Sequence, residues 1–285
     1  MLKRTVLRTS IAIIGMAFFM GLTPSIHADH VKVILLGGQS NMDGRGGSGG
    51  LPQALKSPQN DVRFYYRGNP SLTTLRPGSG DDFGPEVQFG RNVADEFSSD
   101  NFALIKHAVG GTDLDTDWAP NNGGTYNAFR NTVNAGLTAL TDAGHTYEIV
   151  GMLWAQGETD AKDGRTTAQY EADLNAFIGD IRTRYGEDLP FFLSRLSSGQ
   201  TDVPANGLTQ IRAAQNNVAA NDSNAYLIDT DGFGLKDDDL HFNAAGQVEL
   251  GEAFGNTFIN AINVPEPASM LVFGVVGAFV MARRR

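Results

Sequence analysis

The chain has 285 residues, of which 41% are hydrophobic and 19% are charged, a balance typical of globular proteins that argues against wholesale disorder. It contains no cysteine, which excludes disulfides, thiolate metal sites and a cysteine nucleophile. Residues 29–263 carry 16 basic and 31 acidic side chains, and their formal net charge of −15 disfavours binding to nucleic acid.

The first 28 residues have the organisation of a secretory signal peptide. The positively charged start consists of Lys3, Arg4 and Arg8. An apolar stretch of 12 residues, Ile11–Leu22, follows, and the small residue Ala28 marks the expected cleavage point. An uncleaved membrane anchor is the alternative, but such a stretch is too short to cross about 30 Å of hydrocarbon. We therefore expect residues 1–28 to direct export.

Apolar runs along the chain predict the strands of a buried sheet. Continuous runs are typical of strands covered on both faces of a parallel sheet. The five runs are Val31–Leu36, Phe102–Ile105, Ile149–Trp154, Pro190–Leu196 and Ala225–Ile228. A shorter run, Val62–Tyr66, is a candidate edge strand.

Helical periodicity fills the segments between these runs. The expected helices are 87–97, 126–140, 170–185, 208–220 and 244–262. Thr166 and Gln169 form a capping-box signal before the third helix, and Asn243 is a candidate cap for the last. Strands separated by such helices predict right-handed crossovers. The fold class is therefore α/β: one three-layer α/β/α sandwich over residues 29–263, with a mainly parallel five-stranded, flavodoxin-like sheet.

The C-terminal residues 264–285 combine three features. Pro265-Glu266-Pro267 precedes an apolar run, Ala268–Ala282, and Arg283–Arg285 closes the chain. The run is short for a spanning helix, and the arginines would hold it at the cytoplasmic leaflet. This order resembles the bacterial PEP-CTERM sorting signal, which implies an exosortase-type processing enzyme as partner and transient membrane association. A simple C-terminal anchor is the alternative.

Whether the tail is a sorting signal or a simple anchor, the domain is expected in the periplasm, at the cell surface or in the extracellular matrix of a bacterium. Whether the tail is cleaved stays open.

Two loops resemble ligand-binding loops, one for phosphate and one for calcium, but their residues do not fit either kind of site. The glycine-rich loop 43–59 lacks the lysine of a phosphate-binding loop and the spacing of a dinucleotide fingerprint, so we interpret it as a surface loop beside the site. Asp113, Asp115 and Asp117 mimic the start of a calcium loop, but Trp118 and Gly124 stand where a glycine and a bidentate acid are required. Because the five histidines also lack ligand spacing, we expect no metal and no cofactor.

Four polar motifs follow four of the predicted strands. They are Gly37–Met42, His107–Thr112, Trp154–Asp160 and Asp237–Asn243. Each alone has a structural explanation, such as a cap, a turn or a buried hydrogen bond. Because the loops after parallel strands gather at one edge of the sheet, where ligands bind, the four together predict a functional site.

The residue types in these motifs permit acyl transfer. A serine hydroxyl becomes a nucleophile when a neighbouring base removes its proton, and a carboxylate must orient that base. Ser40 is the candidate nucleophile and His241 the candidate base. Asp238, three residues before the histidine, is the preferred partner, and Asp237 and Asp239 are alternatives.

Stabilisation of a tetrahedral oxyanion requires several hydrogen-bond donors. The candidates are the backbone N–H groups of Ser40 and of Gly110 or Gly111, and the Gln156 side-chain amide. Glycine suits such a place because its backbone approaches the substrate unobstructed. The remaining candidates for substrate binding or support are Glu158, Gln39, Asn41, Thr112 and Trp118. Glu158 would either support His241 or bind a sugar hydroxyl, and Trp118 would offer a face to a sugar ring.

The serine does not lie in a G-x-S-x-G elbow, because Met42 occupies the place of the second glycine; this argues against the α/β-hydrolase fold. Five motifs instead resemble those of the SGNH hydrolases, and among them the sialate O-acetylesterase and acetylxylan esterase group of carbohydrate esterases. They are GQSNM at 38–42, FGPE at 83–86, GGT at 110–112, WAQGE at 154–158 and DDLHF at 238–242.

The resemblance implies the SGNH hydrolase fold, with Ser40 as nucleophile, His241 as base, Asp238 as its partner and acetate released from an acetylated sugar. The asparagine of the superfamily's third motif is absent, and Gln156 is expected to take its place.

The leading hypothesis is a secreted, cofactor-free serine esterase that deacetylates a polysaccharide, an oligosaccharide or a sialic acid. The alternative is a non-catalytic glycan-binding or matrix protein at the cell surface, and a broad lipid or aryl esterase is a third. The sequence leaves the sugar, the ester position and the oligomeric state open.

Overall fold

The computed structural model describes residues 28–69, 71–78 and 82–263. The expected sorting tail and nearly all of the expected signal peptide lie outside the described residues. Within the described ranges, no helix combines the length and the apolar composition needed to cross a membrane.

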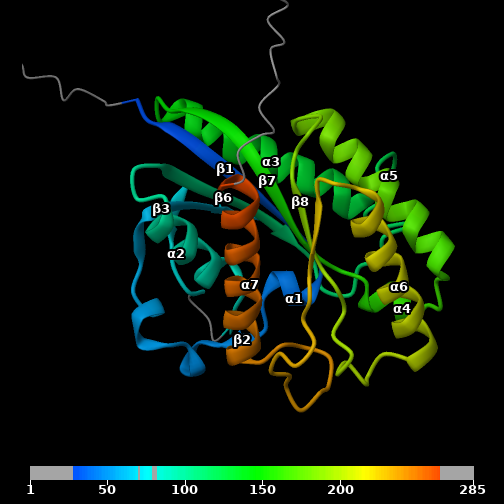
Figure 1. The fold of residues 1–285 in the computed structure, drawn as a ribbon. Helices are drawn as coiled ribbons and strands as arrows, with labels where there is room; N and C mark the ends of the chain where they lie inside the picture. The colour runs from blue at the N-terminus through cyan, green and yellow to red at the C-terminus, as the bar shows by residue number, and fades with distance from the viewer. Residues whose placement is uncertain (1–27, 70, 79–81, 264–285) are drawn as a thin grey trace, which may run out of the picture.

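A seven-stranded sheet forms the centre of the described chain (Figure 1). Its strands, in spatial order, are β4 (Thr73–Leu75), β3 (Gln59–Tyr66), β6 (Asn101–Ala108), β1 (His30–Gly38), β7 (Thr146–Ala155), β8 (Phe191–Ser194) and β9 (Ala225–Ile228). Neighbouring strands are parallel except β4, which pairs antiparallel with β3. The predicted parallel sheet is confirmed, and β3 and β4 extend it beyond the five expected strands. β3 is not the edge strand, because β4 lies outside it. The sequence did not indicate β4, since its three residues are too few to form an apolar run.

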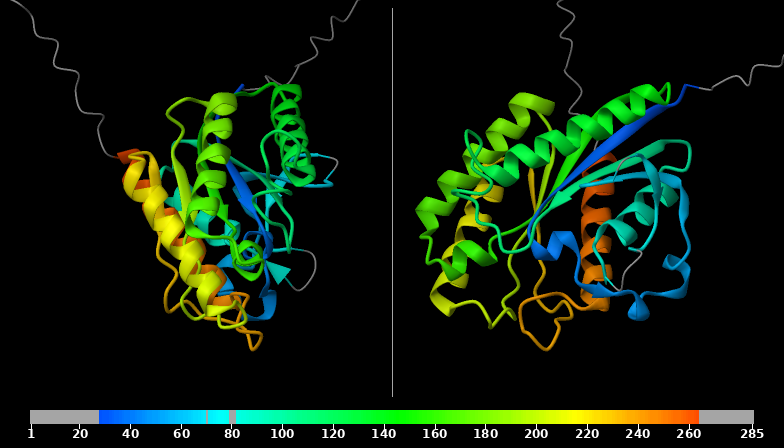
Figure 2. Two further views of the ribbon diagram at one scale, coloured as in Figure 1. Left: turned by 90° about the vertical axis from the view of Figure 1, so that its right-hand side faces the viewer. Right: turned by 180° about the vertical axis from the view of Figure 1, so that it is seen from behind.

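Helices cover both faces of the sheet, as the sequence predicted (Figure 2). They are α2 (Glu86–Glu96), α3 (Gly124–Asp142), α5 (Thr167–Tyr185), α6 (Ala205–Asn221) and α7 (Ala244–Asn263). One core lies between the sheet and α2 and α7, and the other between the sheet and α3, α5 and α6. The strands alternate between the two cores: Leu35 and Ile105 face one, and Leu36 and Leu104 face the other.

Both predicted helix caps are present. The Thr166 hydroxyl accepts a hydrogen bond from the Gln169 backbone N–H, and the Gln169 side chain accepts one from the Thr166 N–H. Asn243 Oδ1 accepts a hydrogen bond from the Gly246 N–H at 3.0 Å. Because that cap begins α7, it also determines where the preceding loop ends.

The sequence did not predict several short elements. They are α1 (Ser40–Asp43), β2 (Gly46–Gly47), the 3₁₀ turns η1 (Ser48–Gly50) and η2 (Gln53–Leu55), β5 (Asp82–Phe83) and α4 (Glu158–Lys162). Each is too short for hydrophobic periodicity to indicate it. Part of the loop 43–59 is therefore regular, since β2 pairs with β5.

Trp118 and Trp154 are both fully buried and pack edge to face, with ring centroids 4.9 Å apart. Phe177 of α5 contacts both rings from the same core. The expectation that Trp118 offers a stacking face to a sugar is therefore corrected, because its indole belongs to the hydrophobic core.

Gly38, at the end of β1, has a φ of +141° that disfavours any residue with a Cβ. A Cβ there would overlap the carbonyl oxygen of Ala155 and lie 2.8 Å from its carbon. We expect Gly38→Ala to lower the free energy of unfolding by at least about 1–3 kcal/mol, measured by urea denaturation. Gly49→Ala is the matched control, since no atom lies within 4 Å of its added methyl group. Equal effects of the two substitutions would contradict this prediction.

Candidate active site

The carboxyl ends of the parallel strands meet at the lower edge of the sheet in Figure 1, beside α1. Ser40 begins α1, two residues after β1 ends, and His241 lies in the loop before α7. The Ser40 hydroxyl and His241 Nε2 are 3.0 Å apart and share a hydrogen bond. His241 Nδ1 is 2.8 Å from Asp238 Oδ2. The structure thus joins in one hydrogen-bonded chain the three side chains that the sequence singled out for catalysis.

Asp238 is held by the backbone around the histidine. Its Oδ1 accepts hydrogen bonds from the N–H groups of His241, at 2.9 Å, and of Leu240, at 3.0 Å. Partial burial acts to raise the pKa of Asp238, but the backbone and ring hydrogen bonds from His241, together with that from Leu240, outweigh it and lower the pKa to about 2. The carboxylate therefore stays ionised above about pH 3.

Neither alternative carboxylate contacts the imidazole. Asp239 Oδ2 accepts a hydrogen bond from the Thr201 hydroxyl at 3.1 Å. Asp239 has a left-handed backbone with a φ of 49°, which turns the chain so that Asp238 reaches back to the ring. Asp237 is exposed, and among the described residues its carboxylate has no hydrogen-bond partner.

Asn41 connects α1, the helix that begins at Ser40, to the loop that holds His241. Its Oδ1 accepts a hydrogen bond from the Phe242 N–H at 3.0 Å. Its Nδ2 donates to Glu158 Oε1 at 2.6 Å and to the Leu240 carbonyl at 3.3 Å. Because these bonds flank His241 on both sides in the chain, Asn41 determines the position of the imidazole relative to Ser40.

Glu158 supports the same loop without contacting the imidazole. Gln200 Nε2 donates to Glu158 Oε1 at 3.2 Å and to the Leu240 carbonyl at 2.8 Å. Glu158 is buried at the start of α4, so in this structure it acts through Asn41 and Gln200. Sequence reasoning missed Gln200, since a single glutamine in a loop outside any motif gives no signal.

Gly110 faces Ser40. A Cβ on Gly110 would lie 3.4 Å from the Ser40 Cβ, whereas nothing lies within 4 Å of one on Gly111. Gly111 has a φ of +74° and makes the turn. Within the described part of the chain, the backbone N–H groups of Ser40 and Gly110 donate to no protein acceptor. Both are therefore available to an oxygen bound between them.

Gln156, the third expected donor, has its amide committed elsewhere. Its Nε2 donates to the Thr112 carbonyl at 3.1 Å and to the Asp160 carboxylate, and its Oε1 accepts from the Tyr170 hydroxyl. Gln156 is 1% exposed. The geometry differs from the sequence expectation, since the amide holds the loop after β6 in place instead of facing bound substrate.

Gln39 and Thr112 are likewise structural in position. Gln39 Oε1 accepts hydrogen bonds from the Gly157 and Thr159 N–H groups, both at 3.4 Å, at the start of α4. The Thr112 hydroxyl donates to the Val109 carbonyl and accepts from the Trp118 indole N–H. Both side chains are buried and stabilise the loops that present Ser40 and Gly110.

The FGPE motif supports the C-terminal end of α1. Lys106 Nζ lies 2.6 Å from Glu86 Oε2 and 3.0 Å from the Asp43 carbonyl oxygen, the last of α1. Both side chains are buried, so the ion pair is shielded from water. A cation at the C-terminal end of a helix is favoured by the helix dipole.

Asp160 is fully buried beside Gln156, and its carboxylate also accepts hydrogen bonds from the Leu114 N–H. Burial raises the pKa of Asp160 to about 7 against these bonds. The folded state therefore binds this proton more tightly than the unfolded state does. Stability is lost as pH rises from about 4 through 7, by up to about 4 kcal/mol from this group.

Comparing urea denaturation at pH 5 and pH 8 tests this. We expect the free energy of unfolding to fall by fewer kcal/mol between these pH values in Asp160→Asn than in the unmodified protein, because the amide does not titrate. The exposed Asp163→Asn is the control. Equal pH dependence in all three proteins would show that Asp160 is not the buried titrating group.

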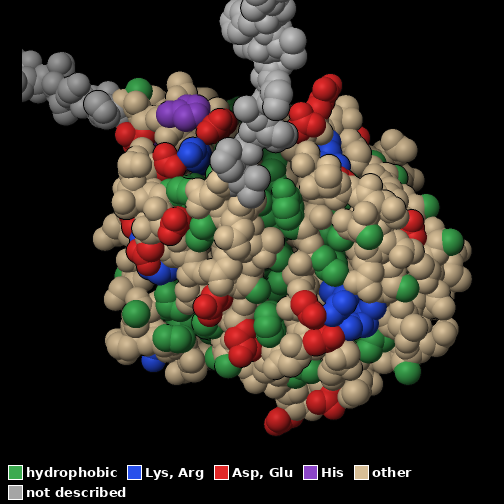
Figure 3. Space-filling view, viewed as in Figure 1, with side chains coloured by type: hydrophobic (Ala, Val, Ile, Leu, Met, Phe, Trp, Pro, Cys, Tyr) green, Lys and Arg blue, Asp and Glu red, His purple; other side chains and the backbone are tan. Residues whose placement is uncertain are grey.

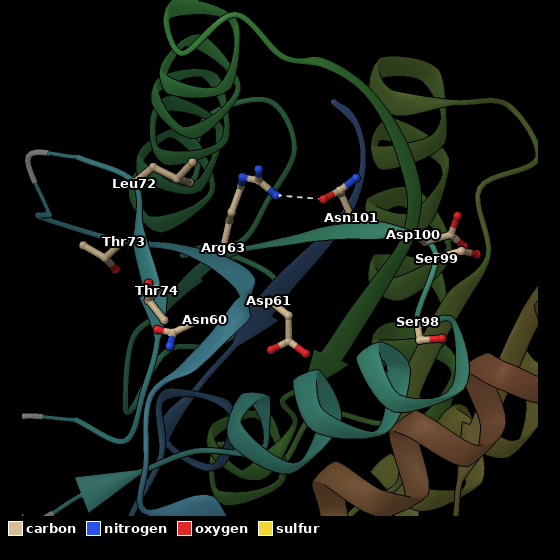
Figure 4. A pocket seen from close by; sticks show the side chains of 10 residues that line it. All are labelled: Asn60, Asp61, Arg63, Leu72, Thr73, Thr74, Ser98, Ser99, Asp100 and Asn101. Carbon is tan, nitrogen blue, oxygen red and sulfur yellow. Dashed lines mark hydrogen bonds between the residues drawn. The ribbon is translucent and has the colours of Figure 1, made fainter. Parts of the chain in front are cut away.

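A cavity of about 630 Å³ lies at the opposite edge of the sheet (Figure 4). Its polar side chains include Asp61, Arg63, Asp100 and Asn101, and Arg63 donates to Asn101. None of the four polar motifs contributes to it. The charged groups there are already paired, Asp61 with Arg91, Arg63 with Asp29 and Asp100 with Lys32. The candidate active site is therefore the edge that carries Ser40.

A hydroxyl, an imidazole and a carboxylate in line, with backbone donors beside the hydroxyl, define the catalytic geometry of a serine hydrolase. Residues 30–260 match the family model of carbohydrate esterases described as sialic acid-specific acetylesterase, and the chain belongs to that family. It is therefore a carboxylic ester hydrolase, and its mainly parallel α/β/α architecture is that of the SGNH hydrolases. Residues 263–285 match the PEP-CTERM protein-sorting motif, which points to an exported bacterial protein.

A probable carbohydrate esterase of Arabidopsis thaliana is 24% identical over 250 residues, covering 80% of this chain and 90% of the relative. An Arabidopsis thaliana crystal structure superimposes with a TM-score of 0.68 at 22% identity, covering 82% of this chain and 98% of the other. The structure of a carbohydrate acetylesterase of Xanthomonas citri superimposes with a TM-score of 0.59 at 18% identity, covering 79% of this chain and 55% of the other. At these identities the structural likeness shows the fold.

Proposed function

We propose that the chain is an exported serine esterase that removes acetyl groups from a carbohydrate by a Ser-His-Asp acyl-enzyme mechanism. The supporting observation is the hydrogen-bonded chain from Ser40 through His241 to Asp238, with free backbone N–H groups beside the hydroxyl. The family supports an ester of a sugar as substrate.

In this mechanism His241 Nε2 takes the proton of the Ser40 hydroxyl while the oxygen attacks the acetyl carbonyl carbon. Asp238 accepts the hydrogen bond from Nδ1–H and stabilises the imidazolium that forms. The N–H groups of Ser40 and Gly110 bind the developing oxyanion.

His241 then gives its proton to the departing sugar oxygen, which leaves an acetyl group on Ser40. Water, deprotonated by the same imidazole, attacks the acetyl-enzyme; the bond between the acetyl carbon and the Ser40 oxygen breaks, the imidazolium returns the proton to that oxygen, and acetate is released.

The proposal extends to the ends of the chain. We infer a signal peptide over residues 1–28, the esterase domain over 29–263 and a sorting tail over 264–285. The tail would be processed by an exosortase-type enzyme after a transient stay in the membrane, and the enzyme would act in the periplasm, at the cell surface or in the extracellular matrix.

Release of acetate tests the function. The purified protein is incubated with acetylated xylan, with an O-acetylated sialic acid and with 4-nitrophenyl esters of two to eight carbons. We expect acetate from at least one sugar, and the highest kcat/KM in the 4-nitrophenyl series for the acetyl ester. Faster cleavage of longer acyl chains, without acetate from any sugar, would favour a lipid or aryl esterase instead.

A further inference from the structure

Two arginines share the carboxylate of Asp43, the last residue of α1. Asp43 Oδ2 lies 3.0 Å from Arg45 Nη1, and Asp43 Oδ1 lies 3.3 Å from Arg67 Nη2. Arg45 and Arg67 are 29% and 35% exposed, whereas Asp43 is 10% exposed. One carboxylate cannot neutralise two guanidinium groups, so this cluster presents a net positive charge to the solvent beside Ser40.

Arg45 reaches the space in front of the nucleophile. The point where a Gly110 Cβ would lie is 2.9 Å from Arg45 Nη2 and 3.4 Å from the Ser40 Cβ. Nη1 is bound to Asp43 and to the Gly44 carbonyl, but in the described ranges Nη2 donates to no acceptor. A guanidinium nitrogen with unused hydrogens thus borders the place where the ester must bind.

Two adjoining cavities of about 350 and 360 Å³, which share Arg76, Pro77 and Gly78, are connected to this cluster through Tyr66, which lines the second cavity and contacts Asp43. Lys56 lines the first, and the Tyr66 contact is a hydrogen bond that its hydroxyl donates to Asp43. Among the described residues, no aspartate or glutamate lines either cavity.

Cavities lined by basic but not by acidic side chains are unusual for this molecule. Residues 29–263 carry a net charge of −15, and acidic side chains are spread over the face shown in Figure 3.

The second cavity also has the surface that a sugar ring needs. Phe64 and Tyr66, alternate residues of β3, line it with nearly parallel rings, 7° apart in plane and 6.1 Å apart between centroids. Asn69, Thr73 and Thr74 add hydrogen-bonding side chains. Aromatic walls with a few polar groups and a cation are typical of sites for polar organic ligands.

We propose that these cavities are subsites for the neighbouring residues of an acidic glycan chain, so that the substrate is an acetylated oligosaccharide or polysaccharide that contains uronic acids. Arg45 binds a carboxylate at the ester-bearing residue, and Arg76 and Lys56 bind carboxylates further along the chain. Arginine suits this task because its planar fork matches a carboxylate. The inference rests on the proposed esterase function and adds the class of sugar and the need for a chain.

The test compares acetylated oligogalacturonides of two to eight residues with neutral acetylated xylo-oligosaccharides of the same lengths and with a free O-acetylated sialic acid. We expect the highest kcat/KM for the acidic oligomers, rising with chain length. Raising NaCl from 50 to 500 mM should reduce their advantage over the neutral oligomers, because salt screens the charges.

Arg76→Gln and Lys56→Gln should each lower kcat/KM for the acidic oligomers about tenfold more than they lower kcat/KM for 4-nitrophenyl acetate. A tenfold loss is the size expected when one hydrogen bond to a charged group is removed. Arg130→Gln on α3 removes one positive charge far from the cavities and is the matched control.

Equal kcat/KM for acidic and neutral oligomers would overturn the inference, and so would a free sialic acid as best substrate with no effect of chain length. Both results leave the esterase function standing. If no ester is cleaved at all, the proposed function itself fails.

Discussion

Ser40→Ala is expected to lower kcat for 4-nitrophenyl acetate by about 10,000-fold or more, because the covalent intermediate cannot form without the hydroxyl. The Ser40 hydroxyl lies 3.0 Å from His241 Nε2. Because the serine side chain is small, its loss should leave the fold intact. Steady-state kinetics and acetate release measure the effect.

Ser99→Ala is the matched control, since Ser99 lies at the opposite edge of the sheet. Circular dichroism and thermal unfolding of both variants should match those of the unmodified protein. Activity within tenfold of normal in a folded Ser40→Ala protein would exclude Ser40 as nucleophile, and the proposed mechanism with it.

Asp238→Asn is expected to lower kcat by about 10,000-fold, the size seen when an amide replaces the carboxylate that orients a catalytic histidine. The amide would favour the wrong tautomer and would not stabilise an imidazolium. Because the pKa of Asp238 is about 2, the group is ionised across the working range, so the loss should be similar at pH 6 and pH 9.

Two neighbours make this test selective. Asp237→Asn removes an equal charge one residue away and should change kcat by less than about threefold, since surface charges interact weakly through water. Glu158→Gln keeps its contact atoms and should lower kcat far less than Asp238→Asn does. A larger effect at Glu158 than at Asp238 would reverse their roles.

Much of the fold could be predicted because its long elements carry strong local signals. The apolar run Val31–Leu36 indicates β1, and helical periodicity indicates α3 and α5 within a few residues. Short elements without an apolar run, such as α1 and β4, have no such signal, because a single turn or a short edge strand has no periodicity. Their positions depend on contacts with distant segments, such as the pairing of β4 with β3.

The candidate site divides in the same way. Ser40, His241 and Asp238 could be named because their residue types permit one chemistry and their motifs follow predicted strands. Gln156 and Trp118 have suitable chemistry, but burial and hydrogen-bonding partners decide their positions, and no sequence pattern reports these. Arg45 was passed over because its glycine-rich surroundings indicated only a surface loop.

The order of residues alone therefore determined the layered α/β architecture, the edge at which the site lies and the nucleophile, base and acid proposed for it, since each follows from local pattern and residue chemistry. Only the tertiary structure decided that Asp238 and not Glu158 contacts the imidazole, that Gly110 faces Ser40 and that Arg45 lies beside both. The reason is physical: a hydrogen bond is made or lost by differences in distance of a few tenths of an ångström, and these distances are set when segments far apart in the chain pack together, as Ser40 and His241 do across 201 residues.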